Sequence, residues 1–406
     1  MLSTVRSHGS VCCRKFMKSS ATVLKKALII AVVSLVVCEY LIYPIVLYQC
    51  FWPEQKQDGR SRENETLRAM ILADTHLLGP FRGHWFDKLR REWQMHRAFQ
   101  TAMTLFQPEA VFFLGDVFDE GNWVNEEGFK EYVNRFHQLF SVKENGKTRS
   151  FVVTGNHDMG FHYEIIPYLH HRFNKAFNAS SVRLLKLKGS NFLMLNSMAM
   201  EMDGCFLCSS AMKSLLDISK TLECEKNPDL CSKYGLQKPS ANLFSSPVLL
   251  QHFPMYRKSD ETCKGEDAAP ENEKVIKFRE SYDCLSKDSS DFLFQLIKPR
   301  LILSGHTHHH CITEHLNEER TEKLTMEYSV PSFSWRNRND PSFYLAIFTP
   351  GEYNLSKCYM PKESTVYFLY SVGGIILMLW LIFSPYNIRR KLANWSRKAS
   401  LSHHEE

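Results

Sequence analysis

Five short groups of metal-ligating residues lie in order along the middle of this chain. They are Asp74-Thr75-His76, Gly115-Asp116 with Asp119, Gly155-Asn156-His157-Asp158, the lone His252, and Gly305-His306-Thr307-His308. Aspartate, asparagine and neutral histidine are ligands for divalent transition metals. A single Asp-x-His is common in proteins that bind no metal, whereas Gly-Asn-His-Asp and Gly-His-Thr-His are more specific. Together the groups offer enough ligands for two metal ions.

Each group follows a short apolar segment that is typical of a buried strand. These segments are residues 67–73, 110–114, 151–154, 246–250 and 301–303. Residues 88–106 and 126–140 have the apolar spacing of amphipathic helices. Strands that alternate with helices predict an α/β layered domain with the ligand groups at one edge of a sheet. Further strands are expected at residues 182–187 and 192–195, and strands that complete a second sheet at residues 324–330 and 342–348.

The ordered motifs from Leu67 to His308 resemble those of the calcineurin-like metallophosphoesterases. The resemblance implies a four-layer αββα sandwich that hydrolyses phosphoric esters with two divalent ions, and manganese is the expected ion. Carried over position by position, the family pattern implies a first ion on Asp74, His76, Asp116 and His308, and a second on Asp116, Asn156, His252 and His306. A shared Asp116 suits such a site, because a bridging carboxylate offsets the repulsion between ions about 3.5–4 Å apart. His306 and His308 would point the same way if the preceding strand continued through them.

The same resemblance assigns roles to neighbouring residues. His157 matches the family position that contacts phosphate and assists the leaving oxygen. Asp119 and Asp158 are expected to orient histidines from behind the metal ligands. His309 and His310 have no role in the family pattern and are interpreted as part of a solvated loop, although His310 could approach the substrate.

Both ends of the chain carry apolar stretches long enough to cross a bilayer. The expected organisation is a basic cytosolic tail (1–26), a membrane span (27–48), a catalytic domain (49–364) with a Cys-rich insert (200–290), a second span (365–384) and a cytosolic tail (385–406). The first stretch is too long for the apolar region of a signal peptide and lacks a clear cleavage site. Glu39 within it is either a recognition point or a protonated or helix-paired carboxyl group, because a carboxylate inside a membrane is costly.

The distribution of charge predicts the orientation of these spans. Of the net charge of +6, the first 26 residues contribute +6 and residues 386–406 contribute +3, which leaves −3 for the residues between. Basic flanks stay in the cytosol, so the catalytic domain should lie in the lumen of the secretory pathway. Glycosylation sequons at Asn64, Asn178 and Asn354 agree with this placement. The basicity therefore reflects membrane topology, and no nucleic-acid partner is expected.

Six cysteines cluster between the third and fifth motifs. They are Cys205, Cys208, Cys224, Cys231, Cys263 and Cys284. In an oxidising lumen they predict disulfides within a loop-rich insert, and the sequence leaves their pairing open. A structural zinc site built from the first four is the alternative. Residues 205–245 and 257–288 are interpreted as irregular excursions from the sheet.

The resemblance is closest to family members that remodel glycosylphosphatidylinositol (GPI) anchors. It implies removal of the ethanolamine-phosphate side group from the second mannose, with GPI-anchored proteins as substrates and cargo receptors for export from the endoplasmic reticulum as partners. The expected location is endoplasmic reticulum exit sites, the intermediate compartment and the Golgi membrane. The chain ends in Ser402-His403-His404-Glu405-Glu406, without the dilysine retrieval signal of some related chains. Another lumenal phosphoester as substrate, or a non-catalytic cargo adaptor, are the alternatives.

Overall fold

The computed structural model describes residues 21–54, 65–142, 148–239, 244–316 and 323–401. These residues belong to two compact units, one formed by Val46–Met360 and one by the two terminal segments. Most of the basic N-terminal tail, the sequon residue Asn64 and residues 402–406 lie outside the described residues.

The larger unit contains two β-sheets. The first has the strand order β11-β10-β1-β2-β3, and the second has the order β4-β5-β6-β7-β9-β8. The strand bounds are β1 Leu67–Leu72, β2 Ala110–Leu114, β3 Arg149–Val153, β4 Val182–Leu187, β5 Ser190–Leu195, β6 Val248–Gln251, β7 Leu301–Ser304, β8 Cys311–Leu316, β9 Lys323–Ser329, β10 Ser342–Phe348 and β11 Tyr353–Tyr359. Strands β1, β2 and β3 are parallel, as are β5, β6, β7 and β9, so their carboxyl ends gather along one edge of each sheet.

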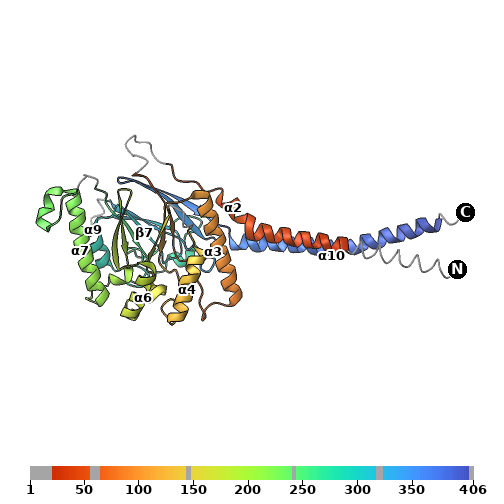
Figure 1. The fold of residues 1–406 in the computed structure, drawn as a ribbon, viewed down its shortest axis with the longest axis horizontal. Coiled ribbons are helices and arrows are strands. Elements are labelled where there is room, and N and C mark those ends of the chain that lie inside the picture. The colour runs from red at the N-terminus through yellow and green to blue at the C-terminus, as the bar shows by residue number, and fades with distance from the viewer. Residues whose placement is uncertain (1–20, 55–64, 143–147, 240–243, 317–322, 402–406) are drawn as a thin grey trace. The chain divides into compact units, whose positions relative to one another are not determined.

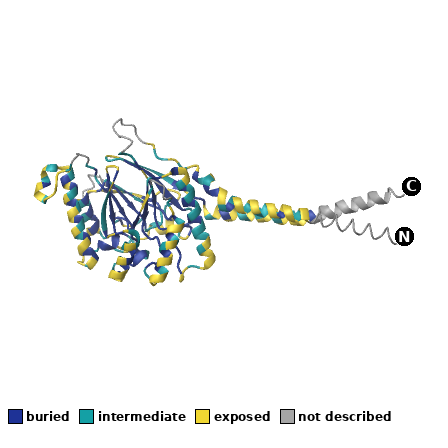
Figure 2. Ribbon diagram, in the orientation of Figure 1, coloured by how far each residue is buried: buried dark blue, intermediate teal, exposed yellow. Residues whose placement is uncertain are grey.

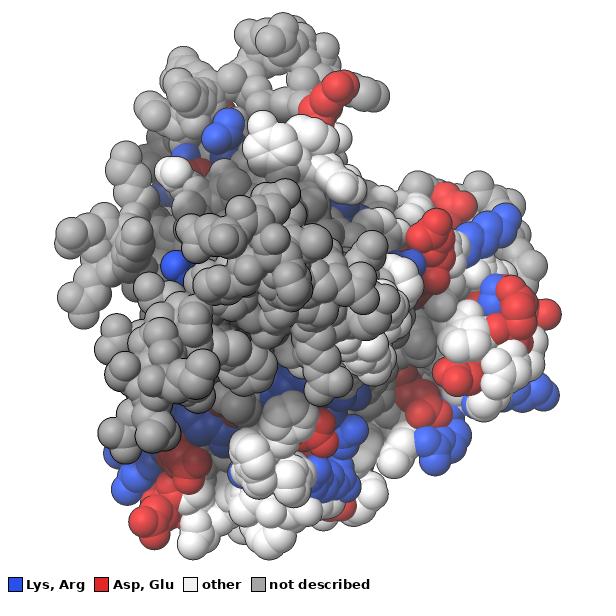
Figure 3. Space-filling model, turned by 90° about the vertical axis from the view of Figure 1, so that its right-hand side faces the viewer, with Lys and Arg blue, Asp and Glu red and all other residues white. Residues whose placement is uncertain are grey.

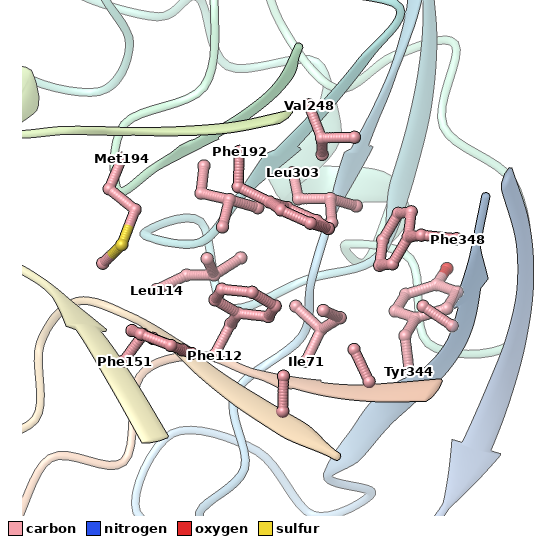
Figure 4. Close-up of a cluster of buried hydrophobic side chains, with 14 of the residues drawn as sticks. Ile71, Phe112, Leu114, Phe151, Phe192, Met194, Val248, Leu303, Tyr344 and Phe348 are labelled. Atoms are coloured by element: carbon pink, nitrogen blue, oxygen red, sulfur yellow. The ribbon is translucent and has the colours of Figure 1, made fainter. Parts of the chain in front are cut away.

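The core lies between the two sheets (Figure 4). Phe112 of β2 stacks on Phe192 of β5, with ring centroids 5.2 Å apart, and on Phe151 of the neighbouring strand at 5.3 Å. Phe192 in turn meets the ring of Phe348 edge-on at 5.0 Å. Burying each such ring stabilises the fold by about 1.5–3 kcal/mol, so this aromatic row fixes the two sheets face to face.

Helices cover the outer faces of the sheets. Helices α3 and α4 lie toward one side of the sandwich and α7 and α9 toward the other (Figure 1). The helix bounds in this unit are α3 Trp85–Phe106, α4 Glu126–Leu139, α5 Asn156–Met159, α6 Pro167–Phe177, α7 Phe206–Lys226, α8 Glu271–Lys274 and α9 Lys287–Ile297. Short 3₁₀ turns are η3 His162–Glu164, η4 Ser197–Ala199, η5 Pro228–Leu230 and η6 Ser232–Tyr234. The predicted αββα sandwich is confirmed.

Two predictions about secondary structure are wrong. Residues 205–245 are not wholly irregular, because α7 extends over 21 residues there. Strand β10 does not belong to the second sheet but pairs antiparallel with β1 in the first. Every residue of β10 is buried, so it has none of the alternation of a strand with one exposed face.

Four disulfides join cysteines of the larger unit. They are Cys50–Cys358, Cys205–Cys208, Cys224–Cys231 and Cys263–Cys311. The expectation that the six clustered cysteines pair among themselves therefore fails for two of them, because Cys263 pairs with Cys311 and Cys284 keeps its thiol. The four-cysteine zinc site is also wrong, since its two pairs lie at opposite ends of α7, about 28 Å apart along a helix of that length.

The smaller unit consists of helices apolar enough to cross a membrane. The spans are Ala21–Leu47 and Glu363–Ser384, and both are largely exposed along their length (Figure 2). The first run includes the π-helical turn η1 Val37–Leu41 followed by α2 Ile42–Leu47. Pro44 lies within α2 and cannot donate to a preceding carbonyl, so a widened turn just before it relieves the backbone. These two helices indicate a membrane protein.

The second terminal helix, α10, runs from Glu363 to Leu401 and so continues well past the predicted end of the span at residue 384. Within the smaller unit, the Tyr370 hydroxyl donates a hydrogen bond to Glu39. Of the two interpretations of Glu39, the structure favours the helix-paired carboxyl group.

Candidate metal centre

The five predicted motifs converge at the carboxyl ends of β1, β2, β3, β6 and β7. Five of their residues have a positive φ, namely Asp74 (53°), His76 (44°), Asp116 (47°), His306 (71°) and His308 (61°). Such a backbone conformation is unfavourable for residues other than glycine and is found where side chains are held for function. The prediction that strand alternation orients His306 and His308 is therefore wrong. Strand β7 ends at Ser304, and a tight loop orients the two histidines.

The first predicted ligand set is assembled in one place. One ligand atom from each of Asp74, His76, Asp116 and His308 can be chosen so that all lie within 4.8 Å of one another. The Nε2 atom of His76 lies 3.1 Å from Nε2 of His308 and 3.5 Å from Oδ2 of Asp116. Ligand atoms about 2.1 Å from one ion are roughly 3–3.5 Å from each other, so this spacing suits a shared ion.

The second predicted set meets the first at Asp116. The Nε2 atom of His252 lies 3.2 Å from Oδ2 of Asp116 and 3.1 Å from Oδ1 of Asn156. His306 completes the set, with its ring centroid 5.0 Å from that of His252. The structure thus brings all seven predicted ligands together, with Asp116 between the two sets, in a site for two divalent ions.

Three of the four ligand histidines are held through the ring nitrogen that does not face the centre. Nδ1 of His76 bonds Oδ1 of Asp119 at 3.1 Å, Nδ1 of His252 bonds the Leu114 carbonyl at 2.7 Å, and Nε2 of His306 bonds the Tyr282 carbonyl at 2.8 Å. Each contact fixes the tautomer and leaves the other nitrogen as an acceptor for a cation. This pattern confirms the predicted role of Asp119 and is the arrangement expected of metal-binding histidines.

His157 lies beside the first set but is anchored differently. Its Nδ1 atom bonds the carbonyl of Asp119 at 2.8 Å, and its ring meets that of His76 edge-on, with centroids 4.8 Å apart. Its backbone N–H donates to Oδ1 of Asp116 at 2.8 Å. The half-buried ring therefore has Nε2 available for a proton transfer.

Burial shifts the pKa values of the acidic groups and histidines at this edge of the sheets. Burial raises the pKa of Asp74 to about 8; the charge of Asp116 adds to this rise, while His252 opposes it. Burial lowers the pKa of His306 to about 3, which favours the neutral ring that a metal needs. His252 differs: burial lowers its pKa, but Asp116 and Asp74 outweigh burial and raise it to about 9. A divalent ion between these carboxylates would replace the His252 proton and offset their charge, so the donor set fits two such ions.

Three predictions about residues flanking the ligands need correction. Asp158 orients no histidine; instead its carboxylate accepts the backbone N–H groups of Gly155 (2.8 Å) and Phe118 (3.0 Å), and so ties two motif loops together. His310 is buried and bonds the Tyr344 hydroxyl at 3.0 Å. His309 contacts Arg338 at 3.2 Å, so neither histidine belongs to a solvated loop.

Other residues that hold the centre were not singled out from the sequence. Arg338 bonds the carbonyl of His308 at 2.6 Å, and the Ser332 hydroxyl bonds the carbonyl of Asp74 at 2.7 Å. Buried Glu327 accepts the backbone N–H of Met255 at 3.0 Å and the Ser304 hydroxyl at 2.7 Å, beside the His252 and His306 loops. The one available signal was an acidic residue within a predicted strand, and among the predicted strands it applies to Glu327 alone.

Comparison with known proteins agrees with this geometry. The family model for calcineurin-like phosphoesterase matches residues 67–310. The chain belongs to the calcineurin-like phosphoesterase family. It is therefore a metal-dependent phosphoesterase, and the centre described above is its candidate hydrolytic site.

Curated relatives of this phosphoesterase cover most of its length. Proteins named Metallophosphoesterase 1 are 50% identical in Ailuropoda melanoleuca (88% of each chain), 49% in Rattus norvegicus (88% of this chain and 89% of that one) and 48% in Gallus gallus (86% of each). Among solved structures, a purple acid phosphatase from yellow lupin has 13% identity and a TM-score of 0.43 over 76% of this chain and 55% of that one. The family assignment does not depend on that structure.

Proposed function

We propose that this phosphoesterase is a phosphodiesterase that removes the ethanolamine-phosphate side group from the second mannose of GPI anchors and so promotes export of GPI-anchored proteins. The observation that carries the hydrolytic part is the complete set of seven ligands around Asp116 with His157 beside it. A non-catalytic adaptor would not need this set to be intact. The substrate rests on the motif resemblance and on two apolar helices that suit an enzyme whose substrate is a lipid of the same membrane.

The bound ions and the side chains around them would have separate roles in the reaction. Two bound ions, with manganese as the proposed metal, would activate water and offset the charge of the phosphoryl group. His157 would donate its Nε2 proton to the departing alkoxide oxygen while the Asp119 carbonyl holds Nδ1. Arg336 is 38% exposed, with Nη2 lying 3.7 Å from Oδ2 of Asp119, and can contact a substrate anion at the rim of the site.

The proposed location is the lumenal side of the early secretory pathway, with both tails in the cytosol. Figure 3 shows Lys and Arg interspersed with Asp and Glu over the visible described part of one face. A mixed surface of this kind leaves the two basic tails as the main determinant of orientation. Cargo receptors that export GPI-anchored proteins are the proposed partners.

The decisive experiment compares anchor glycans in cells. Cells lacking the protein would receive the wild type, His308→Ala or, as a matched control, His171→Ala, a histidine exposed on α6. We expect mass analysis to show ethanolamine-phosphate retained on the second mannose, and slow export, with His308→Ala only. Purified full-length protein would be assayed in parallel on small diesters after metal removal and reloading with manganese, zinc or magnesium. Unchanged anchors beside a dead His308→Ala enzyme would reject this substrate while leaving phosphoester hydrolysis in place.

A further inference from the structure

The pair Cys205–Cys208 has a different setting from the other disulfides of the larger unit. The sequence Cys205-Phe206-Leu207-Cys208 begins α7, and Cys205 is the N-cap residue of that helix. The Sγ atom of Cys205 accepts the backbone N–H of Cys208 at 2.9 Å. None of the phosphoesterase contacts described above uses this pair.

The two sulfurs of the pair differ in accessibility. Cys205 is half-buried, whereas Cys208 is only 4% exposed. Met202 and Phe206 beside Cys205 are 44% and 47% exposed, and a Cβ on Gly204 would meet no atom within 4 Å. By contrast, both cysteines of Cys224–Cys231 are buried, as are those of Cys263–Cys311. A thiol from solution can therefore reach one sulfur of the first pair and neither sulfur of those two.

The position of Cys205 also stabilises its reduced form. A thiolate at the N-terminus of a 21-residue helix gains from the helix dipole and from the Cys208 N–H that already points at its sulfur. Stabilising the thiolate favours the dithiol over the disulfide and makes the bond easier to reduce.

His162 lies beside the buried sulfur of Cys208. Its Nδ1 atom lies 4.0 Å from Sγ of Cys208 and 3.2 Å from the Met198 carbonyl, and its Nε2 atom lies 2.8 Å from Oδ2 of Asp203. Both ring nitrogens thus face oxygen acceptors, and a doubly protonated ring satisfies both. Such a ring would place positive charge beside the Cys208 sulfur when that sulfur leaves as a thiolate.

We propose that Cys205 and Cys208 form a thiol–disulfide exchange site, which takes a dithiol, or two molecules of a monothiol, as its co-reactant. In the first step the co-reactant's thiolate attacks Sγ of Cys205, forms a mixed disulfide and releases the Cys208 thiolate beside His162. In the second step the other thiolate of the dithiol, or the thiolate of the second monothiol molecule, attacks the co-reactant's sulfur in the mixed disulfide. This attack releases the Cys205 thiolate. Two electrons pass to the protein, two protons from the co-reactant's thiols complete the cysteine thiols, and the co-reactant leaves as a disulfide. This activity does not depend on the proposed GPI substrate.

The test uses the full-length protein in detergent, equilibrated in glutathione buffers of increasing reducing strength. Thiols are trapped with acid, alkylated and counted by peptide mass spectrometry. We expect Cys205–Cys208 to be half-reduced at a GSH²/GSSG ratio at least about tenfold below that needed for Cys224–Cys231, equivalent to about 30 mV for a two-electron couple. The second pair, which joins Cys224 near the other end of α7 to Cys231 beyond it, is the internal control. Reduction of both pairs at the same ratio would overturn the proposal.

Single-cysteine variants test the asymmetry of the pair. In Cys208→Ser the remaining Cys205 should react with iodoacetamide at pH 7 at least about tenfold faster than the remaining Cys208 in Cys205→Ser. His162→Gln should slow reduction of the wild-type pair without changing that of Cys224–Cys231. Equal reactivity of the two cysteines would contradict the proposal. Stoichiometric uptake of Zn²⁺ by the reduced pair with His162 and Asp203, followed by failure to reoxidise, would reassign these four residues to a structural metal site.

Discussion

The shared carboxylate of Asp116 is the residue on which both ligand sets depend. Its Oδ2 atom lies near His76 and His252, and its Oδ1 atom accepts the backbone N–H of His157. A neutral amide at this position would keep the shape but remove the charge that two neighbouring cations need between them. His157 touches the same group without being one of the seven predicted ligands.

We therefore predict different outcomes for two substitutions at neighbouring positions. Asp116→Asn should lower metal content from two ions per chain and abolish turnover, whereas His157→Ala should keep both ions and lose activity by about 10²–10⁴-fold. Elemental analysis beside kinetics on the purified protein would measure both. Full metal occupancy in Asp116→Asn would contradict the shared role of this residue.

The leaving group gives a second prediction for His157. If its Nε2 proton goes to the departing oxygen, His157→Ala should slow an alkyl ester far more than a nitrophenyl ester, whose leaving group needs little protonation. The ratio of the two rates in wild type and variant measures this directly. An equal loss on both esters would indicate that His157 only positions its neighbours.

Residue types in ordered motifs marked the candidate ligands, because few other roles explain Asp, Asn and His at these spacings, and the family resemblance supplied their division into two sets. The supports were not predictable for a physical reason. Tyr282 and Leu114 hold His306 and His252 through backbone carbonyls, which any residue can supply. Arg338 acts from a loop 30 residues beyond His308, and only the folded chain brings the two together.

At the scale of elements, the apolar segments that lead into motifs located five of the eleven described strands, namely β1, β2, β3, β6 and β7. Strand β2 and strand β4 have the bounds expected from the sequence. Helix α7 was missed because two cysteines and a serine lie on its buried face. Strand β10 was placed in the wrong sheet because strand pairing leaves no local signal. Periodicity reports how a segment is buried, not which neighbour buries it.

A buried carboxylate on strand β9 links several of these elements. Although burial raises it, the pKa of Glu327 is held below its ordinary value of 4.5 by the hydrogen bond and charge of His315, together with Arg257 and Ser304. Through Ser304, His315 and Met255, this side chain joins the ends of β6 and β7 to β8. A carboxyl group with a lowered pKa stabilises the fold fully above its unfolded pKa, and loses that contribution as the pH falls through its folded pKa.

Glu327→Gln should therefore destabilise the protein by about 1.5–3 kcal/mol at pH 7, the typical value of hydrogen bonds to a charged group. The difference in unfolding free energy between the variant and the wild type should shrink below pH 4.5, where the carboxyl group is protonated in the unfolded chain. It should vanish once the carboxyl group is also protonated in the folded protein. Urea unfolding of both proteins across this range, followed by pulse proteolysis, would test it. A difference independent of pH would mean that charge is not what Glu327 contributes.

At the scale of the whole molecule, the two terminal spans and their flanking charges predict a lumenal domain. Asn178 is exposed at the C-cap of α6, and Asn354 lies half-buried on the edge strand β11, so Asn178 should be the better glycan acceptor of the two. Glycosidase should increase the mobility of the wild type on a gel, and Asn178→Gln should remove more of that shift than Asn354→Gln. Absence of any shift, with the domain open to protease from the cytosolic side, would place it in the cytosol.

The disulfide Cys50–Cys358 closes the larger unit near both of its ends, and its cysteines are 308 positions apart in the sequence. Because a longer loop loses more freedom in the unfolded chain, removing this bond with a double Ser substitution should cost roughly 2–5 kcal/mol. The same change at Cys224–Cys231, whose cysteines are only seven positions apart, should cost roughly half as much. Unfolding midpoints of the two variants in detergent would compare them, and equal losses would argue against this entropic origin.

The Cys50–Cys358 disulfide also affects how the larger unit would respond to a pulling force. The chain enters the larger unit at Val46 and leaves it at Met360, only a few residues outside Cys50 and Cys358. Tension applied through the two terminal helices is then carried by a covalent link before it reaches the β10–β11 ladder, whose edge strand would otherwise peel away first. Without the link, the same pull could draw out up to roughly 1000 Å of chain. In the proposed membrane setting, this bond would keep a pull on the two terminal helices from unfolding the unit that holds the metal centre.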